Sequence, residues 1–360
     1  MRKRAREEIT TVPTLYQEAV AQEDPDVVPH LSSYASFSSA LYRHRRHTIP
    51  ALPQTRGDVE LDGKWTETAD GQPYLLFADG EYDEKMLVFS SMDQLTVLQS
   101  ADNLYMDSTF SSCPSLWNQV YIIHARRGSK TYPLVFALLP DRQRTTYCRR
   151  FHRLTEEVQQ KLNRILAPAS VQIDFEQAAI RAIETEFPAA KVRGCYSHFS
   201  QAIWRKVQDL GLAVQYQGDP DVRLWVRRAS SLALLPEGDV QDAWVDAMDT
   251  TPEVDNAQRF NDYIVTTWVD DDARFPIPQW NHHRNVGPRT KNNLEVFHYR
   301  MNKTLPHHHP NIYRCVELIK QIEKSESAKM RQIDFGAPFQ VRKRVYREKR
   351  KQTCPIVGPT

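Results

Sequence analysis

Short apolar runs separated by tight-turn dipeptides dominate the chain before residue 100. The runs cover 59–68, 73–77 and 85–89, divided by Asp70-Gly71 and Asp79-Gly80. An Asp-Gly pair between two apolar runs is a strong signal for a tight hairpin turn. The pattern therefore predicts a three-stranded β-meander, followed by a short helix that begins at Ser91.

A second group of strand-like runs begins at residue 103. The first run covers 103–110, and two further runs at 118–126 and 131–139 are joined by Arg127-Gly128-Ser129. Apolar runs joined by a short glycine-containing turn are typical of a β-hairpin. These residues predict three consecutive strands that continue an antiparallel arrangement.

Helix-like and strand-like patterns then alternate. Apolar residues between Phe151 and Ile165 recur at spacings of three and four, which predicts an amphipathic helix. A strand that ends at Asp174, a helix over 178–187 and a short strand over 191–196 follow. The order is typical of an RNase H-like α/β fold, in which three antiparallel strands precede parallel strands and helices flank the mixed sheet. In that fold the first and fourth strands lie side by side.

The 120 residues between Asp174 and Glu295 are too many for a loop. Their helix-like stretches are 201–210, 222–235, 240–248 and 257–269, and five tryptophans lie in or near them. We interpret 213–280 as an inserted helical subdomain. The tryptophans suit its core better than base stacking, because their large apolar area favours burial.

Composition is that of a globular protein with charged ends. The 360 residues include 41% hydrophobic side chains and carry a formal net charge of +2, and this length predicts about two domains. Residues 1–6 and 342–351 are strongly basic, which suits a polyanionic partner or nuclear import, although a solvated tail is the alternative. The sequence has no apolar stretch of membrane-spanning length, so we expect a soluble, intracellular protein.

The five cysteines are an odd, scattered set without a repeated spacing. This pattern argues against a disulfide framework and against a self-contained zinc finger.

Three carboxylates stand out by position. Asp107 and Asp174 each end an apolar run, and Glu295 opens a helical pattern. Burying an ionised acid is costly unless it is paired or binds a metal, so three such acids suggest a site for two divalent cations. The alternatives are helix caps, because Asp174 precedes a helix, and Asn292 with Glu295 has capping-box spacing.

Several blocks resemble the transposase domain of Mutator-like elements (MULE), one of the DDE transposases. The blocks are Tyr105-Met106-Asp107-Ser108-Thr109-Phe110, residues 132–140, Asp174-Phe175-Glu176-Gln177-Ala178, Gly194-Cys195-Tyr196-Ser197-His198-Phe199, and Trp280-Asn281 with residues 289–298. They occur in the family's order over roughly residues 35–305. Ser108 replaces the usual glycine of the first block, and the cysteines and histidines of the zinc module that many relatives carry are not seen in this sequence.

The resemblance implies nicking of element ends and transfer of the freed 3′-hydroxyl into target DNA. It assigns two Mg²⁺ or Mn²⁺ ions to the three acids: Asp107 bridges both ions, Asp174 binds one and Glu295 binds the other. It also implies double-stranded DNA partners, namely the terminal repeats and the target, together with a homo-oligomer and a nuclear location.

Other residues are candidate DNA contacts. The resemblance places the pair Cys195 and His198 in the active-site region, so we interpret His198 as a phosphate or leaving-group contact and Cys195 as a packing residue beside the site. His298 is a second candidate contact, and Arg289 and Lys291 would neutralise phosphate. The basic cluster with Arg43, Arg45 and Arg46 either follows phosphate or forms the surface of a short helix.

The predicted organisation has six parts. They are a poorly ordered N-terminus (1–30), a helix and β-meander (31–100), the first part of the RNase H-like core (101–212), the inserted helical subdomain (213–280), the last part of the core (281–330) and a basic tail (331–360). Two other functions remain open at this point. One is a host-captured DNA-binding or regulatory protein that no longer transposes, and the other is a different RNase H-like nuclease.

Overall fold

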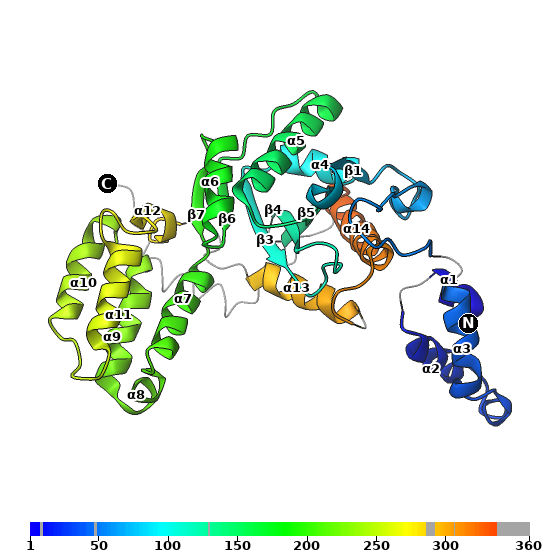
Figure 1. Cartoon of the computed structure of the whole chain (residues 1–360), viewed down its shortest axis with the longest axis horizontal. Coiled ribbons are helices and arrows are strands. Elements are labelled where there is room, and N and C mark those ends of the chain that lie inside the picture. Colours follow the sequence, from blue (N-terminus) through cyan, green and yellow to red (C-terminus); the bar gives the residue numbers. More distant parts are fainter. Residues whose placement is uncertain (8–9, 47–48, 129, 286–291, 306, 337–360) are drawn as a thin grey trace. The chain divides into compact units, whose positions relative to one another are not determined.

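The computed structural model describes residues 1–336 except 8–9, 47–48, 129, 286–291 and 306 (Figure 1). The chain divides into two compact units. Unit 1 is made of Met1–Leu98, Thr109–Pro140 and the described residues from Phe297 onward. Unit 2 is made of Gln99–Ser108 and Asp141–Val296. Each unit joins segments that are distant in the sequence.

Seven strands form one mixed sheet in the order β1-β2-β5-β4-β3-β6-β7. The strands are β1 (Leu75–Asp79), β2 (Met86–Phe89), β3 (Asn103–Thr109), β4 (Gln119–Arg127), β5 (Lys130–Leu139), β6 (Ser170–Ile173) and β7 (Lys191–Gly194). In unit 1, β1, β2, β5 and β4 pair antiparallel. In unit 2, β3, β6 and β7 pair parallel. The structure therefore confirms a mixed α/β fold whose sheet is flanked by helices.

The first strand predicted for the N-terminal meander is wrong. Residues 59–68 contain a 3-10 turn at Gly63–Trp65 instead of a strand. The Trp65 side chain is only 4% exposed, and its ring centroid lies 4.8 Å from that of Tyr313. Burial of this one large ring against a distant helix holds the segment in place, so its apolar residues are buried without strand pairing.

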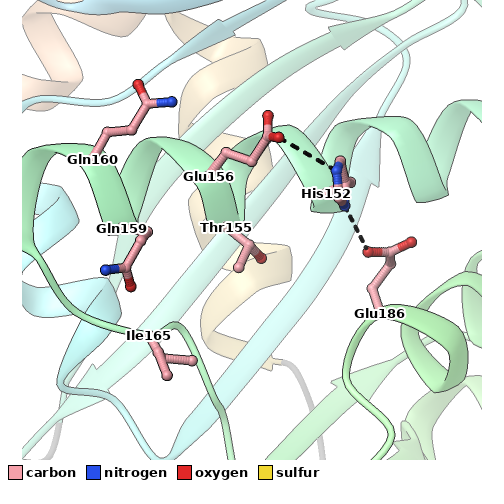
Figure 2. A pocket seen from close by; sticks show the side chains of 7 residues that line it. All are labelled: His152, Thr155, Glu156, Gln159, Gln160, Ile165 and Glu186. Atoms are coloured by element: carbon pink, nitrogen blue, oxygen red, sulfur yellow. Dashed lines mark ion pairs between the residues drawn. The ribbon is translucent and has the colours of Figure 1, made fainter.

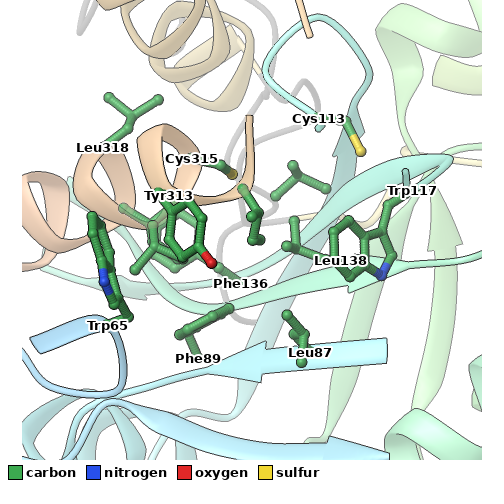
Figure 3. Packing of buried hydrophobic residues seen from close by; sticks show 14 of the residues in the cluster. Trp65, Leu87, Phe89, Cys113, Trp117, Phe136, Leu138, Tyr313, Cys315 and Leu318 are labelled. Atoms are coloured by element: carbon green, nitrogen blue, oxygen red, sulfur yellow. The ribbon is translucent and has the colours of Figure 1, made fainter. Parts of the chain in front are cut away.

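The core of unit 1 forms between its strands and helix α14 (Ile312–Asp334), as Figure 3 shows. The helix buries residues at helical spacing along one face, including Ile312, Val316 and Ile319. Phe89 and Phe136 belong to the same cluster from the strands. The predicted short helix after Ser91 is present as α4 (Met92–Gln99).

Two cysteines in this core give a direct test of the packing. Cys113 and Cys315 are 1% and 0% exposed, and burial raises the pKa of the Cys113 thiol to about 12. Because the thiolate is the reactive form, we expect iodoacetamide at pH 8 to alkylate Cys113 about 1,000-fold more slowly in the native protein than in guanidinium. Peptide-resolved mass spectrometry measures both rates. Equal rates in the two conditions would show that this cysteine is not buried.

Three helices near the N-terminus form a small separate cluster. They are α1 (Arg2–Glu7), α2 (Val12–Ala21) and α3 (Tyr34–Arg46), and their buried residues are Ala5, Val12, Leu15 and Leu41. Residues predicted to be poorly ordered thus contain two helices. In α3, the Arg45 guanidinium donates to the carbonyl oxygens of Ala5 (3.0 Å) and Thr10 (2.5 Å), whereas Arg43 and Arg46 are exposed.

Helices make up most of unit 2 beyond its strands. They are α5 (Arg144–Leu162), α6 (Gln177–Glu186), α7 (Tyr196–Asp209), α8 (Ala213–Gly218), α9 (Pro220–Ser231), α10 (Val240–Met248), α11 (Ala257–Ile264) and α12 (Ile277–Trp280). Trp225, Trp244, Trp268 and Trp280 are at most 1% exposed, and Trp204 is half-buried. The prediction that these rings are mainly core residues is confirmed. Among the helices of the described residues, none is long and apolar enough to cross a membrane.

Candidate active site

The register between β3 and β6 brings two of the predicted acids level with each other. These parallel neighbours are paired up to Tyr105 and Gln172, and two residues further along each chain lie Asp107 and Asp174. Alternate residues of a strand share a face, and neighbouring strands lie about 4.8 Å apart. The register therefore puts the two residues at corresponding positions toward the carboxyl ends of β3 and β6. The predicted adjacency of the first and fourth core strands is confirmed.

The two acids differ in exposure. Asp107 is 8% exposed, and its Oδ1 accepts a hydrogen bond of 3.0 Å from the backbone amide of Ser108. Asp174 directly follows β6 and is half-buried. A carboxylate with this little solvent is stabilised by hydrogen bonds or by a nearby cation.

Aromatic packing fixes the chain directly after Asp174. The ring of Phe175 lies 4.9 Å from Trp268 and 5.0 Å from Phe275. Gly194 also lies against the ring, and an added Cβ there would come within 2.2 Å of it. Only a glycine fits at the end of β7 with Phe175 in this position, so strand β7 and the aromatic cluster together hold the residue next to the acid.

Glu176 provides a polar anchor for the same segment. Arg142 donates to its two carboxylate oxygens at 3.1 and 2.9 Å, and the Tyr147 hydroxyl donates to it at 2.9 Å. Glu176, not Asp174, occupies the N-cap position of α6, and it makes no side-chain cap bond. The helix-cap alternative for Asp174 is therefore wrong. Sequence reasoning missed Glu176, since its partners lie some thirty residues earlier.

Cys195 and His198 lie at the start of α7. Cys195 is fully buried, and its backbone amide donates to the Ile173 carbonyl at the end of β6 (2.9 Å). His198 is half-buried in the first turn of the helix. Burial of Cys195 agrees with a packing role beside the site.

His282, which the sequence analysis did not single out, is buried and holds the backbone of Gly194. His282 is 1% exposed, and its Nε2 donates to the Gly194 carbonyl at 3.0 Å. Its Nδ1 lies 3.0 Å from the Asn285 amide nitrogen. Since a carbonyl only accepts, Nε2 carries the proton and Nδ1 accepts, which is the neutral ring. The only sequence signal was its position directly after Trp280-Asn281.

The third predicted acid lies on α13 (Asn292–Thr304). Glu295 is exposed in its first turn, and His298 is half-buried one turn later. The ring of His298 lies 6.2 Å from that of His124 in β4. Arg289 and Lys291 lie outside the described residues, as does the Asn292 side chain on which the capping-box alternative depends.

The comparison with known families adds the decisive observation. Residues 103–202 match the MULE transposase domain. The match confirms the resemblance seen in the sequence and supports a transposase-family function. This MULE segment runs from β3 into α7, so it contains Asp107, Asp174, Cys195 and His198, whereas Glu295 lies beyond it. No curated protein matches the chain.

A complete metal centre is not assembled within the part of the chain that the structure describes. No group of three or more His, Cys, Asp or Glu side chains there has a metal-binding arrangement. The paired aspartates of the MULE segment have the oxygen ligands that Mg²⁺ and Mn²⁺ prefer, so the residues fit two of the three predicted positions. The three-carboxylate site stays a prediction.

A pocket of about 470 Å³ lies elsewhere in the MULE segment, on α5 and α6 (Figure 2). Its His152 lies 3.4 Å from a Glu156 oxygen and 3.7 Å from a Glu186 oxygen. None of the predicted site residues lines it. A DNA duplex is too large to enter a pocket of this volume. The open end of the sheet suits a duplex better.

Proposed function

We propose that the chain is a DDE-type DNA transposase of the Mutator-like group. Its reaction would be hydrolytic nicking at the ends of a DNA element, followed by attack of the freed 3′-hydroxyl on target DNA. The observation that supports the proposal is the parallel register of β3 and β6, in which Asp107 and Asp174 hold corresponding positions inside the MULE segment.

The strand order supports an RNase H-like core. From β5 through β4, β3 and β6 to β7, the sheet has the third, second, first, fourth and fifth strands of that core in succession. Core strands one to three (β3, β4 and β5) follow one another in the chain. The fourth (β6) pairs parallel to the first, and the fifth (β7) pairs parallel to the fourth. Strands β1 and β2 extend the antiparallel edge.

Asp107, Asp174 and Glu295 would hold two Mg²⁺ or Mn²⁺ ions. Such ions activate the attacking water or hydroxyl and stabilise the leaving oxygen of an in-line displacement. The protein's own contribution is to fix the ligands: β3 and β6 set the spacing of the aspartates, and Phe175 and Glu176 immobilise the chain beyond Asp174. Glu295, in the first turn of α13, would be the third ligand.

DNA would bind along the same edge. His198 in the first turn of α7 and His298 on α13 are the proposed phosphate contacts. Among the basic residues of α3, the exposed Arg43 and Arg46 suit phosphate binding better than Arg45, whose guanidinium bonds to backbone carbonyls. A homo-oligomer acting in the nucleus fits a reaction that cuts two element ends together.

The test is a cleavage and joining assay with the full chain. Its substrate is an end-labelled duplex carrying the terminal repeats that flank the gene, with a supercoiled plasmid as target. We expect nicks with 3′-hydroxyl ends and joined products in Mg²⁺ or Mn²⁺, and none with a chelator. Repeat binding without any cleavage would instead indicate a captured DNA-binding protein. Cleavage that survives the chelator would contradict the metal mechanism.

A further inference from the structure

A helix and a strand end of unit 1 are joined through a single amide side chain. Asn302, near the end of α13, accepts hydrogen bonds at its Oδ1 from the Ser112 hydroxyl and, at 3.4 Å, from the Thr109 hydroxyl. Ser112 is fully buried and Thr109 is 4% exposed. Thr109 is the last residue of β3, two residues after Asp107. The amide thus contacts the segment that directly follows the proposed catalytic strand.

Asn302 shares one face of α13 with the proposed metal ligand Glu295 and the proposed phosphate contact His298. Glu295, His298 and Asn302 are separated by three and four residues, so they lie on one side of the helix. His298 faces the buried His124, and the neighbouring Phe297 ring meets His124 edge-on at 5.2 Å. Contacts from two successive turns therefore hold α13 in place. Glu295 lies about 10 Å along the helix from Asn302.

The turn after α13 holds the same segment from its other end. The His309 backbone amide donates to the Ser111 carbonyl at 2.9 Å, and its Nδ1 donates to the Cys113 carbonyl at 3.2 Å. Two sets of hydrogen bonds therefore hold the residues after β3, one from Asn302 and one from His309. Only the set from Asn302 comes from the helix that carries Glu295.

We infer that Asn302 is a positioning residue, which fixes α13 against the segment after Asp107 and thereby sets where Glu295 lies. This inference rests on the proposed function for its catalytic consequence. Asn302 would touch neither the DNA nor the reacting atoms. Its loss leaves the helix intact but free to shift, and a misplacement of about 1 Å can lower a rate by roughly 100-fold.

The experiment compares Asn302→Ala with Asn302→Asp in the full chain. Asp keeps the Oδ1 acceptor for both hydroxyls, whereas Ala removes it. We expect Asn302→Ala to lower the nicking rate at saturating repeat DNA by about 10- to 100-fold with unchanged repeat affinity. Asn302→Asp should retain most of the rate. Equal rates for wild type and Asn302→Ala would overturn the inference, as would an equal loss in both variants.

Hydrogen exchange gives a readout that does not depend on catalysis. Asn302→Ala should speed amide exchange in residues 294–304 and 109–113, and Asn302→Asp should not. Tyr74→Phe is the matched control, because it removes another buried hydrogen bond of unit 1, from the Tyr74 hydroxyl to the Ile319 carbonyl at 3.2 Å. It should lower thermal stability without changing exchange in α13 or the nicking rate.

The two readouts separate this inference from the proposed function. If the wild type does not nick DNA but Asn302→Ala still loosens α13, the proposed function fails and the positioning contact stands. If the wild type nicks and Asn302→Ala leaves exchange in α13 unchanged, the positioning role fails and the function stands. If Tyr74→Phe lowers the rate as much as Asn302→Ala, the effect is general destabilisation and the inference is wrong.

Discussion

Asp107→Asn and Asp174→Asn are each expected to lower the rate of metal-dependent DNA nicking by about 1,000-fold, which corresponds to roughly 4 kcal/mol of transition-state stabilisation. Asparagine has the shape of aspartate without its charge, so it cannot balance two divalent cations. At position 107 the amide oxygen can still accept from the Ser108 amide. The fold should therefore survive. Single-turnover nicking measures the effect on the rate, and the melting temperature measures the effect on stability.

Glu156→Gln is the matched control for this prediction. Glu156 is another acid of the MULE segment, but it lies on α5 and its carboxylate accepts a hydrogen bond of 2.7 Å from Arg153. Its change should cost little stability and little rate. Because the two aspartates serve the same ions, the double variant should be hardly slower than the slower single variant. A full rate in either aspartate variant, or an equal loss in Glu156→Gln, would refute the proposed site.

The region from residue 103 to about 209 could be predicted from the sequence because its signals are local. Apolar runs marked β3 to β7, and spacings of three and four marked the helices between them. Once the order of elements was known, the adjacency of β3 and β6 followed from the topology, and Asp107 and Asp174 became neighbours by register. The candidate site could be predicted only as two acids at corresponding positions of adjacent strands, and its role stays a prediction.

The remaining parts depend on packing between distant segments. Residues 59–68 have the composition of a strand, but Trp65 packs against Tyr313, almost 250 residues later. Helices α1 to α3 bury only a few apolar side chains, and those cover one another. Polar residues such as Asn302 and Glu176 have no local signal at all, since their roles are defined only by partners that the fold brings near.

Gly194→Ala is expected to lower the free energy of unfolding of unit 2 by about 3 kcal/mol, near the upper end for overpacking a core. The added methyl group would come within 2.2 and 2.3 Å of two Phe175 ring atoms. The ring cannot move aside easily, because Trp268 and Phe275 pack around it. The strand end cannot withdraw either without breaking the bond from His282 to the Gly194 carbonyl. Tryptophan fluorescence during urea unfolding reports mainly on unit 2, which contains five of the seven tryptophans.

Two further variants show whether the cost is steric. Phe175→Ala empties the space that the new methyl group needs, so in that background Gly194→Ala should cost little, giving a coupling energy of about 2–3 kcal/mol. Gly218→Ala, at a site of unit 2 where an added Cβ meets nothing within 4 Å, should be neutral or slightly stabilising. A Gly194→Ala protein as stable as the wild type would mean that Phe175 does not occupy this position. Because Phe175 directly follows Asp174, the anchoring of that carboxylate would then need another explanation.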